Sequence, residues 1–343
     1  MENSISDGAL IEAINPKSLS LIILPTEKCN FRCTYCYEDF QVGRMSSDKI
    51  LAIKRLLQSR IGTLRQLKLG WFGGEPLAAS DIVLELSEFA QNLCQEHGVK
   101  LLAGDITTNG SLLDEALLRK LVALNQRIFQ ISLDGWQAGH DNTRRHGSGG
   151  GTFDSVWSTL LMMRQTDLNF ATTIRIHLTD INIESVKQLA HAIVKEFSAD
   201  KRFDVFLKPI ENLGGPNAAH ISTLSKSDRM TALAEIERIL EPIQHIDAVS
   251  SHANGYICYA SKPNNLVIRA NGQIAKCTVA FDDPKNHIGT LQDDGTLSLN
   301  NQKLSYWFRG LADRDEDILS CPVYTHPHEK QEDQRKVIAL TPI

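Results

Sequence analysis

Short apolar segments alternate with amphipathic segments along the first two thirds of the sequence. The apolar segments have the length of buried strands and cover residues 19–24, 66–72, 101–107, 128–133, 171–178 and 203–208. Helical periodicity predicts the helices between them, over residues 47–60, 80–97, 114–124, 152–166 and 182–197. Repeated strand–helix units predict a parallel sheet, and right-handed crossovers curl such a sheet. We therefore expect an α/β fold, a partial (β/α)6 barrel of the TIM type.

The composition changes near residue 210, where a polar, glycine-containing stretch predicts a linker. A helix is expected over 228–241, and Asn271-Gly272 between two alternating segments predicts a β-hairpin. We divide the chain into four predicted parts. They are an N-terminal extension (1–18), the barrel (19–210), a linker and helix (211–244) and a small C-terminal domain (245–343).

Three of the seven cysteines, Cys29, Cys33 and Cys36, lie close together directly after the first predicted strand. Parallel α/β sheets bind ligands at the carboxyl ends of their strands, so this segment is expected at the mouth of the barrel. Structural zinc takes four ligands, commonly as two separated pairs, and a disulfide would leave one thiol over. Three thiolates instead suit a cubane iron–sulfur cluster that keeps one iron open to a small molecule.

Charge and the absence of targeting segments exclude several classes of protein. The formal net charge is −5 and no long basic block occurs, which argues against a nucleic-acid partner. The N-terminus "MENSISDGAL" lacks the profile of a signal peptide, and no apolar segment approaches the length of a membrane span. We expect a cytoplasmic protein, in which cysteines serve metal ligation more often than disulfides.

The spacing C-x3-C-x2-C, with Tyr35 just before the third cysteine, resembles the signature of the radical S-adenosylmethionine (radical SAM) enzymes. Further motifs of that family follow in order at predicted strand ends: "GGEP" (73–76), "TTNG" (107–110) and "SLDG" (132–135), with Arg144 after the last. Together they resemble the peptide-modifying branch that carries a C-terminal SPASM or twitch domain. The resemblance implies a 4Fe-4S cluster on the three cysteines, S-adenosyl-L-methionine on its open iron, and an electron donor of the flavodoxin or ferredoxin type.

The resemblance also implies contacts with S-adenosylmethionine. Tyr35 would lie beside the adenine and Ser132 at the ribose, and the guanidinium fork of Arg144 would pair with the carboxylate. Asp134 is a further candidate, although it is equally explained as a turn residue. Arg144 has the alternative of an ordinary surface charge in a polar loop.

The glycine motif and the third strand end supply the remaining candidate contacts. Gly73, Gly74 and Glu75 would receive the amino group of the cofactor, because glycines allow a close approach of the main chain. Thr108 and Asn109 follow the third strand, and Asn109 has the alternative of a structural turn residue. No catalytic base is assigned.

The C-terminal region departs from the SPASM pattern, which holds two auxiliary clusters on about seven cysteines. Only Cys258, Cys277 and Cys321 lie beyond residue 250, so we expect a reduced, twitch-like domain with one auxiliary 4Fe-4S cluster. The fourth iron is either open or bound by His326 or His328, and the alternative is a degenerate domain without a cluster. Cys94 lies on the apolar face of the helix predicted over residues 80–97 and is therefore expected in the core.

The leading functional expectation is an enzyme that installs an intramolecular cross-link, carbon–carbon or thioether, in a ribosomally made precursor peptide. Thr278 stands where sulfatase-maturating enzymes have an aspartate base, and Asp282 and Asp283 are displaced from that place, so sulfatase maturation is not expected. Peptide epimerisation, with Cys321 as hydrogen donor, and a radical reaction on a small molecule are the alternatives. A non-enzymatic iron–sulfur or zinc scaffold would leave "GGEP" and "SLDG" without a role. The precursor is expected to dock along a strand edge or to be presented by a separate peptide-recognition protein.

Overall fold

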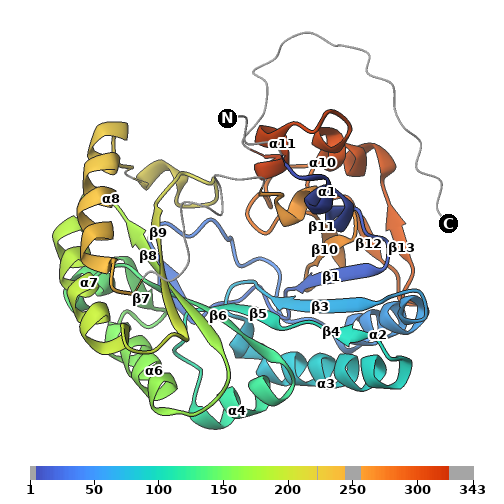
Figure 1. The fold of residues 1–343 in the computed structure, drawn as a ribbon, viewed down its shortest axis with the longest axis horizontal. Coiled ribbons are helices and arrows are strands. Elements are labelled where there is room, and N and C mark those ends of the chain that lie inside the picture. Colours follow the sequence, from blue (N-terminus) through green and yellow to red (C-terminus); the bar gives the residue numbers. More distant parts are fainter. Residues whose placement is uncertain (1–4, 222, 244–255, 324–343) are drawn as a thin grey trace.

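A computed structural model describes residues 5–221, 223–243 and 256–323 of the chain (Figure 1). One sheet runs through both the predicted barrel and the predicted C-terminal domain, in the strand order β13-β12-β11-β10-β1-β3-β5-β6-β8-β9. In the described ranges, no helix combines the length and the apolar character needed to cross a membrane.

The barrel part of the sheet is parallel throughout. Its strands are β1 (Ser18–Ile23), β3 (Gln66–Trp71), β5 (Gly104–Thr108), β6 (Gln126–Leu133), β8 (Ala171–Leu178) and β9 (Phe203–Pro209). The expected strand 101–107 is interrupted, because β4 (Lys100–Leu101) pairs beside the start of β3 before β5 begins. The predicted partial parallel α/β barrel is thereby confirmed.

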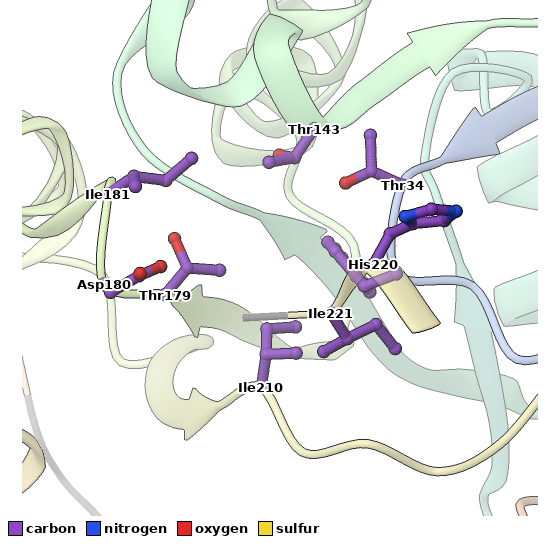
Figure 2. A pocket seen from close by; sticks show the side chains of 9 residues that line it. Thr34, Thr143, Thr179, Asp180, Ile181, Ile210, His220 and Ile221 are labelled. Atoms are coloured by element: carbon purple, nitrogen blue, oxygen red, sulfur yellow. The ribbon is translucent and has the colours of Figure 1, made fainter. Parts of the chain in front are cut away.

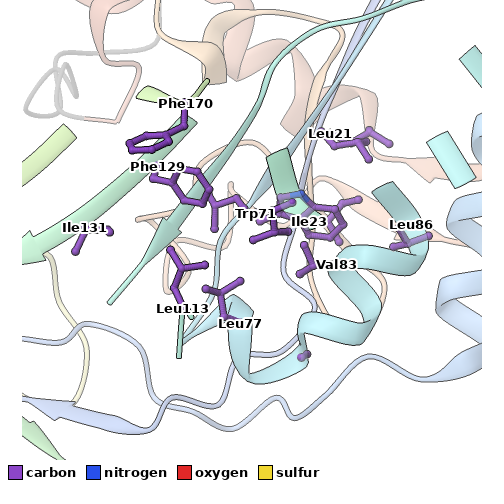
Figure 3. Close-up of a cluster of buried hydrophobic side chains, with 14 of the residues drawn as sticks. Leu21, Ile23, Trp71, Leu77, Val83, Leu86, Leu113, Phe129, Ile131 and Phe170 are labelled. Atoms are coloured by element: carbon purple, nitrogen blue, oxygen red, sulfur yellow. The ribbon is translucent and has the colours of Figure 1, made fainter. Parts of the chain in front are cut away.

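Helices cover the convex face of this sheet (Figure 1). They are α2 (Ser47–Ile61), α3 (Ser80–His97), α4 (Glu115–Ala123), α6 (Phe153–Gln165) and α7 (Ile183–Phe197), followed by α8 (Lys226–Leu240). Side-chain caps at Ser46 and Asp114 fix the first residues of α2 and α4, since each accepts a hydrogen bond from a free backbone N–H of the first turn. Figure 3 shows the apolar layer between sheet and helices, with Trp71 of β3 beside Val83 of α3.

Shorter elements precede the first strand or lie between the barrel strands and the helices that follow them. They are α1 (Asp7–Ala13), β2 (Phe31–Cys33), η1 (Pro76–Ala79), α5 (Gln137–Thr143), β7 (Arg144–His146) and η2 (Ala218–His220). Strands β2 and β7 form a separate two-stranded antiparallel ribbon, and helix α1 packs on Ile257 and Leu319 of the C-terminal region. Cys94 lies in the core on α3 with 2% exposure, as its helical spacing predicted.

The C-terminal elements extend the barrel sheet. They are η3 (Tyr259–Ser261), β10 (Asn265–Ile268), β11 (Gln273–Ala275), β12 (Gly289–Leu291), β13 (Leu297–Leu299), α10 (Asn301–Asp313) and α11 (Glu316–Ser320). Strand β10 pairs parallel with β1, and β11 to β13 continue antiparallel. The predicted hairpin is confirmed, with Gly272 at φ 83° in its turn. The four-part division of the chain stays a prediction, because the sheet continues without a break from β1 into β10.

Candidate active site

The first cysteine set lies in the loop between β1 and α2. Strand β2 is part of this loop, and its pairing with β7 brings Arg144 beside the cysteines. Cys33 ends β2 directly opposite Arg144, the first residue of β7. Burial raises the pKa of Cys29 and of Cys36 to about 12, and the nearby Cys33 adds a smaller contribution in the same direction to each. Thiols in such a place bind as thiolates only when a metal offsets the cost of the buried charge.

Backbone N–H groups point at the cysteine sulfurs in a recurring way. The sulfur accepts a hydrogen bond from the residue two positions later in four cases: Cys29, Cys36, Cys258 and Cys277. The distance from Phe31 N to Cys29 Sγ is 3.3 Å, and the distance from Val279 N to Cys277 Sγ is 3.4 Å. Such donors stabilise thiolates and are typical of iron–sulfur ligands.

The cysteines also fit a cluster better than one ion. None of the seven cysteines forms a disulfide, and no group of three or more His, Cys, Asp or Glu side chains in the described part of the chain is arranged to hold a single metal ion. A zinc ion gathers its ligands around one centre, whereas a cubane cluster spreads them over different irons. The residues present therefore fit an iron–sulfur cluster.

A hydrogen-bond network joins three of the predicted cofactor contacts. Arg144 Nη1 donates to Tyr35 Oη at 2.9 Å, and Tyr35 Oη donates to Asp134 Oδ1 at 2.9 Å. His177 Nδ1 lies 3.1 Å from the same Asp134 oxygen and 3.2 Å from Tyr35 Oη. Thr143 Oγ1 donates to Asp134 Oδ2 at 2.6 Å, so both carboxylate oxygens are bound.

Electrostatics fix the charge states in this network. Burial would raise the pKa of Asp134, but the hydrogen bond from His177 and the charge of Arg144 outweigh it and hold the pKa well below its usual range. Burial lowers the pKa of His177 to about 4, despite the opposing effect of Asp134. At neutral pH the network therefore contains a carboxylate, a guanidinium and a neutral imidazole.

One donor of Arg144 is left for a ligand. The side chain is buried, and its Nε has no hydrogen-bond partner in the described structure. An unsatisfied buried donor on a charged group is costly unless a ligand supplies the acceptor. The orphaned atom fits a carboxylate placed beside Cys33, as the resemblance implies for S-adenosylmethionine.

Glu75 joins the second and third strand ends. Its Oε1 accepts hydrogen bonds from Leu77 N at 2.9 Å and Thr108 Oγ1 at 2.7 Å, and its Oε2 accepts one from Asn109 N at 2.7 Å. Asn109 Nδ2 in turn donates to Asn30 Oδ1 at 2.8 Å and lies 3.9 Å from Cys29 Sγ. The "GGEP" and "TTNG" motifs therefore meet the cysteine loop through one buried carboxylate.

The two glycines before Glu75 permit this contact. A Cβ on Gly73 would lie 2.3 Å from Thr26 O, and a Cβ on Gly74 would lie 2.6 Å from the backbone of Lys28. Gly73 also has φ 119°, which side-chain-bearing residues rarely adopt. The space beside both glycines is therefore taken by the backbone of the cysteine loop.

A Gly74→Ala substitution tests this packing. We expect it to destabilise the protein by roughly 1–3 kcal/mol, because the added methyl group meets rigid backbone. Gly43→Ala is the matched control, since a Cβ there meets nothing within 4 Å. Urea unfolding midpoints measure both variants, and equal midpoints would contradict the packing argument.

A cavity of about 100 Å³ opens at the ends of β8 and β9 (Figure 2). Thr34 and Thr143 line one side, and Ile181 and Ile210 approach from the strand ends. Tyr35 also lines the cavity. This combination of apolar side chains and hydroxyl groups beside Tyr35 suits a flat, polar-edged ring. It is the place where the resemblance expects the adenine.

Ser132 and two residues that the sequence analysis missed share the concave face. Ser132 is 8% exposed and pairs in register with Arg175 of β8, whose Nε also has no hydrogen-bond partner in the described structure. His177 lies one alternation further along β8, near the mouth. The available signal was the position of both residues near the carboxyl end of a predicted strand.

The second cysteine set also assembles. Cys258 N donates to Leu319 O at 2.8 Å, which brings it beside the end of α11, where Cys321 follows. Burial raises the pKa of Cys258 to about 11, with smaller contributions from Cys277 and Cys321. Tyr324, His326 and His328, which occupy the stretch after Cys321 where the SPASM pattern has further cysteines, lie outside the described residues.

Tyr37 connects the two cysteine sets. It follows Cys36, and its Oη donates to the carbonyl oxygen of Thr278, next to Cys277, at 3.0 Å. Thr278 is 7% exposed, and its Oγ1 lies 2.8 Å from Tyr259 Oη. Thr278 therefore has a structural role between the sites.

Comparison of the sequence with known proteins agrees with these features. The family model of the radical SAM superfamily matches residues 23–193. The chain is 24% identical over 229 residues to a cysteine-type anaerobic sulfatase-maturating enzyme of Clostridium novyi, covering 64% of this chain and 59% of that protein. It is 30% identical over 164 residues to the enzyme of that type from Clostridium perfringens, covering 44% of this chain and 42% of that protein. The chain thus spans about half the length of these relatives.

Solved structures share the fold. Native anSMEcpe with bound AdoMet and Kp18Cys peptide superimposes with a TM-score of 0.64 at 19% identity, covering 85% of this chain and 84% of that chain. Streptococcus suis SuiB bound to precursor peptide SuiA gives a TM-score of 0.56 at 15% identity, covering 93% of this chain and 70% of that chain.

Proposed function

We propose, from the match of residues 23–193 to the radical SAM superfamily, that this chain is a radical SAM enzyme that installs an intramolecular cross-link, carbon–carbon or thioether, in a ribosomally made precursor peptide. When bound, the cluster and S-adenosylmethionine supply a 5′-deoxyadenosyl radical that takes a hydrogen atom from the peptide. Relatedness to sulfatase-maturating enzymes and a fold shared with SuiB, which was solved with a precursor peptide, support a peptide substrate.

The observation that carries the cross-linking proposal is the second cysteine set. Closing a ring within a peptide removes two hydrogens. The 5′-deoxyadenosyl radical takes one of them as a hydrogen atom, and the other leaves as a proton and an electron. The reaction therefore needs an acceptor for that electron. Cys258, Cys277 and Cys321 would hold an auxiliary 4Fe-4S cluster for that purpose, and Tyr37 ties their loop to the first set. Because Cys321 lies close to the other two thiols, we interpret it as a ligand of the auxiliary cluster. This interpretation is favoured over a role of Cys321 as hydrogen donor in epimerisation.

The residues of the first site have separate tasks in this proposal. Arg144 would hold the cofactor carboxylate through its free Nε, with Tyr35 fixing the guanidinium from the other side. Asp134 and neutral His177 keep Tyr35 in place. Glu75 and the backbone of the "GGEP" motif would receive the amino group of the cofactor. Side chains at the end of β8 and β9 would exclude water from the adenosyl part.

Thr278 supports a reaction other than sulfatase maturation. It takes the place of the aspartate base that the resemblance expects in sulfatase-maturating enzymes, and its hydroxyl and carbonyl are both engaged. Asp282 and Asp283 instead line a separate cavity of about 190 Å³ beside Arg269. The catalytic base stays unassigned.

The strand edges bear on how the peptide is presented. The outer edge of β1 is taken by β10, and β9 ends the sheet on the other side. On β9 the N–H of Val205 donates to Asp204 Oδ1 at 2.7 Å, and Pro209 has no N–H. Such features protect an edge against strand addition. They favour presentation of the precursor by a separate peptide-recognition protein.

Mass spectrometry of a precursor peptide co-expressed with the enzyme tests the proposed function. A cross-linked product is two hydrogens lighter, resists fragmentation between the joined residues and does not react with carbonyl reagents. A carbonyl-reactive product would instead indicate sulfatase-type oxidation. An unchanged mass with an inverted residue would indicate epimerisation, and both of these outcomes contradict cross-linking.

An Arg144→Ala substitution tests the cofactor contacts. We expect S-adenosylmethionine to bind roughly 10- to 100-fold more weakly, because a hydrogen bond to a charged group contributes about 1.5–3 kcal/mol. Equilibrium dialysis of the reconstituted protein measures the affinity, and the iron content is expected to stay unchanged. Arg145→Ala, at the exposed neighbouring position, is the control with unchanged affinity. Loss of iron in the Arg144 variant would show that Arg144 only supports the cysteine loop.

A further inference from the structure

Arg175 is a half-buried arginine on the concave face of the barrel sheet, and the proposed reaction gives it no task. It lies on β8 between Ile174 and Ile176, which are fully buried in the core, so the alternation of side chains directs Arg175 to the opposite face. In register it stands beside Ser132 of β6 on one side and beside Phe206 of β9 on the other. The guanidinium therefore belongs to the face of the sheet that carries the predicted cofactor contacts.

The charge of Arg175 has no partner of its own. In the described part of the chain, Arg144 Nε and Arg175 Nε are the only buried nitrogen atoms of charged side chains without a hydrogen-bond partner, and no ion pair of Arg175 occurs there. Burial lowers the pKa of Arg175, and Asp134 opposes this effect less than Tyr37 and Tyr35 do. Both oxygens of Asp134 already accept hydrogen bonds from other groups. An unsatisfied buried donor on a cation is costly unless a ligand supplies the acceptor.

The guanidinium of Arg175 suits a carboxylate. Its Cζ lies 5.9 Å from the centroid of the Phe206 ring, a distance at which a cation and an aromatic ring attract each other. Nε and one terminal nitrogen of a guanidinium form an edge of two donors that matches the two oxygens of a carboxylate. A ribosomally made peptide carries negative charge at neutral pH on the carboxylates of Asp, Glu and its C-terminus. The ligand that fits is therefore a peptide carboxylate.

The cofactor is not expected to supply this carboxylate. S-adenosylmethionine has one carboxylate, which is assigned to the free Nε of Arg144. Arg175 instead interacts electrostatically with Tyr37, whose Oη donates to the carbonyl oxygen of Thr278 in the second cysteine loop. A peptide that reacts at the first cysteine set and gives an electron to the second must lie between the two sets. Arg175 is thus connected to the region that the substrate, rather than the cofactor, would occupy.

We infer that Arg175 binds a carboxylate of the substrate peptide and so selects a precursor with an acidic side chain, or its own C-terminus, close to the reacting position. The inference rests on the proposed function, because it takes the substrate to be a peptide. The bound carboxylate would supply the missing acceptor at Nε and neutralise the cation. It would also fix one point of the peptide against the barrel sheet.

Three short peptides test the carboxylate site by binding alone. They are a capped pentapeptide with one Glu among alanines, its Gln counterpart, and the Gln counterpart with a free C-terminal carboxylate. Equilibrium dialysis against reconstituted protein that contains S-adenosylmethionine measures the dissociation constants. We expect the wild type to bind at least one charged peptide roughly 10- to 100-fold more tightly than the neutral one, and Arg175→Met to lose this preference.

The two charged peptides distinguish an acidic side chain from a C-terminus as the source of the carboxylate. Equal dissociation constants of all three peptides for the wild type, including no measurable binding of any, would overturn the inference. A preference that persists in Arg175→Met would overturn it as well. Dialysis needs no turnover, so a preserved preference without cross-linked product would contradict the proposed reaction and leave the carboxylate site standing.

Cofactor affinity and stability separate this role of Arg175 from two others. Arg175→Met should not weaken the binding of S-adenosylmethionine, and a weaker affinity would assign Arg175 to the cofactor instead. The melting temperature of Arg175→Met should be unchanged or higher, because the substitution removes a buried charge without an acceptor. The matched control is Arg202→Met. Arg202 is also half-buried over a Phe ring, but it is bound by Asp200 and three backbone carbonyls. Its melting temperature should fall, and an equal fall in Arg175→Met would show a structural role and overturn the inference.

Discussion

The variant with Cys29, Cys33 and Cys36 all replaced by Ala is expected to form no 5′-deoxyadenosine with dithionite, whereas the wild-type protein forms it steadily. The three thiols are the proposed ligands of the cluster, and their loop carries the N–H groups that point at Cys29 and Cys36. Chromatography of the reaction mixture measures the product. The expected effect is a complete loss, because no other side chain in the loop can replace a thiolate ligand.

Cys94→Ala is the matched control for this experiment. Cys94 is buried on α3 among apolar side chains, so its replacement removes a thiol without touching either cysteine set. The control should keep its iron and its cleavage activity, with a modest loss of stability from the lost packing. Cleavage that persists in the triple variant would show that the first cysteine set is not the site of the cofactor.

The second large effect is expected in the C-terminal region. Anaerobically reconstituted wild-type protein should carry about eight irons per chain, four for each cysteine set, and replacing Cys258, Cys277 and Cys321 by Ala should halve that count. Cofactor cleavage should survive, because the first cysteine set is unchanged. Cross-linked peptide should disappear, since the acceptor for the second electron is lost.

Iron analysis and product analysis together decide the second prediction. Tyr37→Phe is the control, because it removes only the hydrogen bond from Tyr37 to Thr278 and keeps all six cysteines of the two sets. Its iron count should equal that of the wild type. A wild-type count near four irons would contradict the auxiliary cluster. Epimerisation, with Cys321 as hydrogen donor, would then be the better proposal.

Much of the fold followed from local patterns. The strands β6 and β8 and the helices α3 and α7 appear close to the residues that periodicity predicted, because burial on one or both faces dictates which positions must be apolar. The break between β4 and β5 was missed, since a continuous apolar segment gives no sign of a change of strand partner. The pairing of β10 with β1 was also missed, as it joins segments that are distant in sequence.

The candidate site shows the same division. Motif order pointed to Tyr35 at the adenine, to Arg144 at the carboxylate and to Asp134 as a cofactor contact or a turn residue. The structure joins all three side chains in one network. His177 escaped detection because its only signal was its position near the carboxyl end of a predicted strand, which it shares with many residues that have no role in a site. Its importance arises from contact with Tyr35, from which it is separated by 142 positions.

The sequence by itself determined the alternation of strands and helices, the spacing of the first cysteine set and the glycines before Glu75, because each depends on neighbouring residues or on a short motif. Only the tertiary structure decided that Arg175 stands beside Ser132, that Tyr37 reaches Thr278 and that Gly74 packs on Lys28. These contacts depend on strand register and on the packing of distant loops. Register and packing are set by burial over the whole sheet, so no short segment contains them.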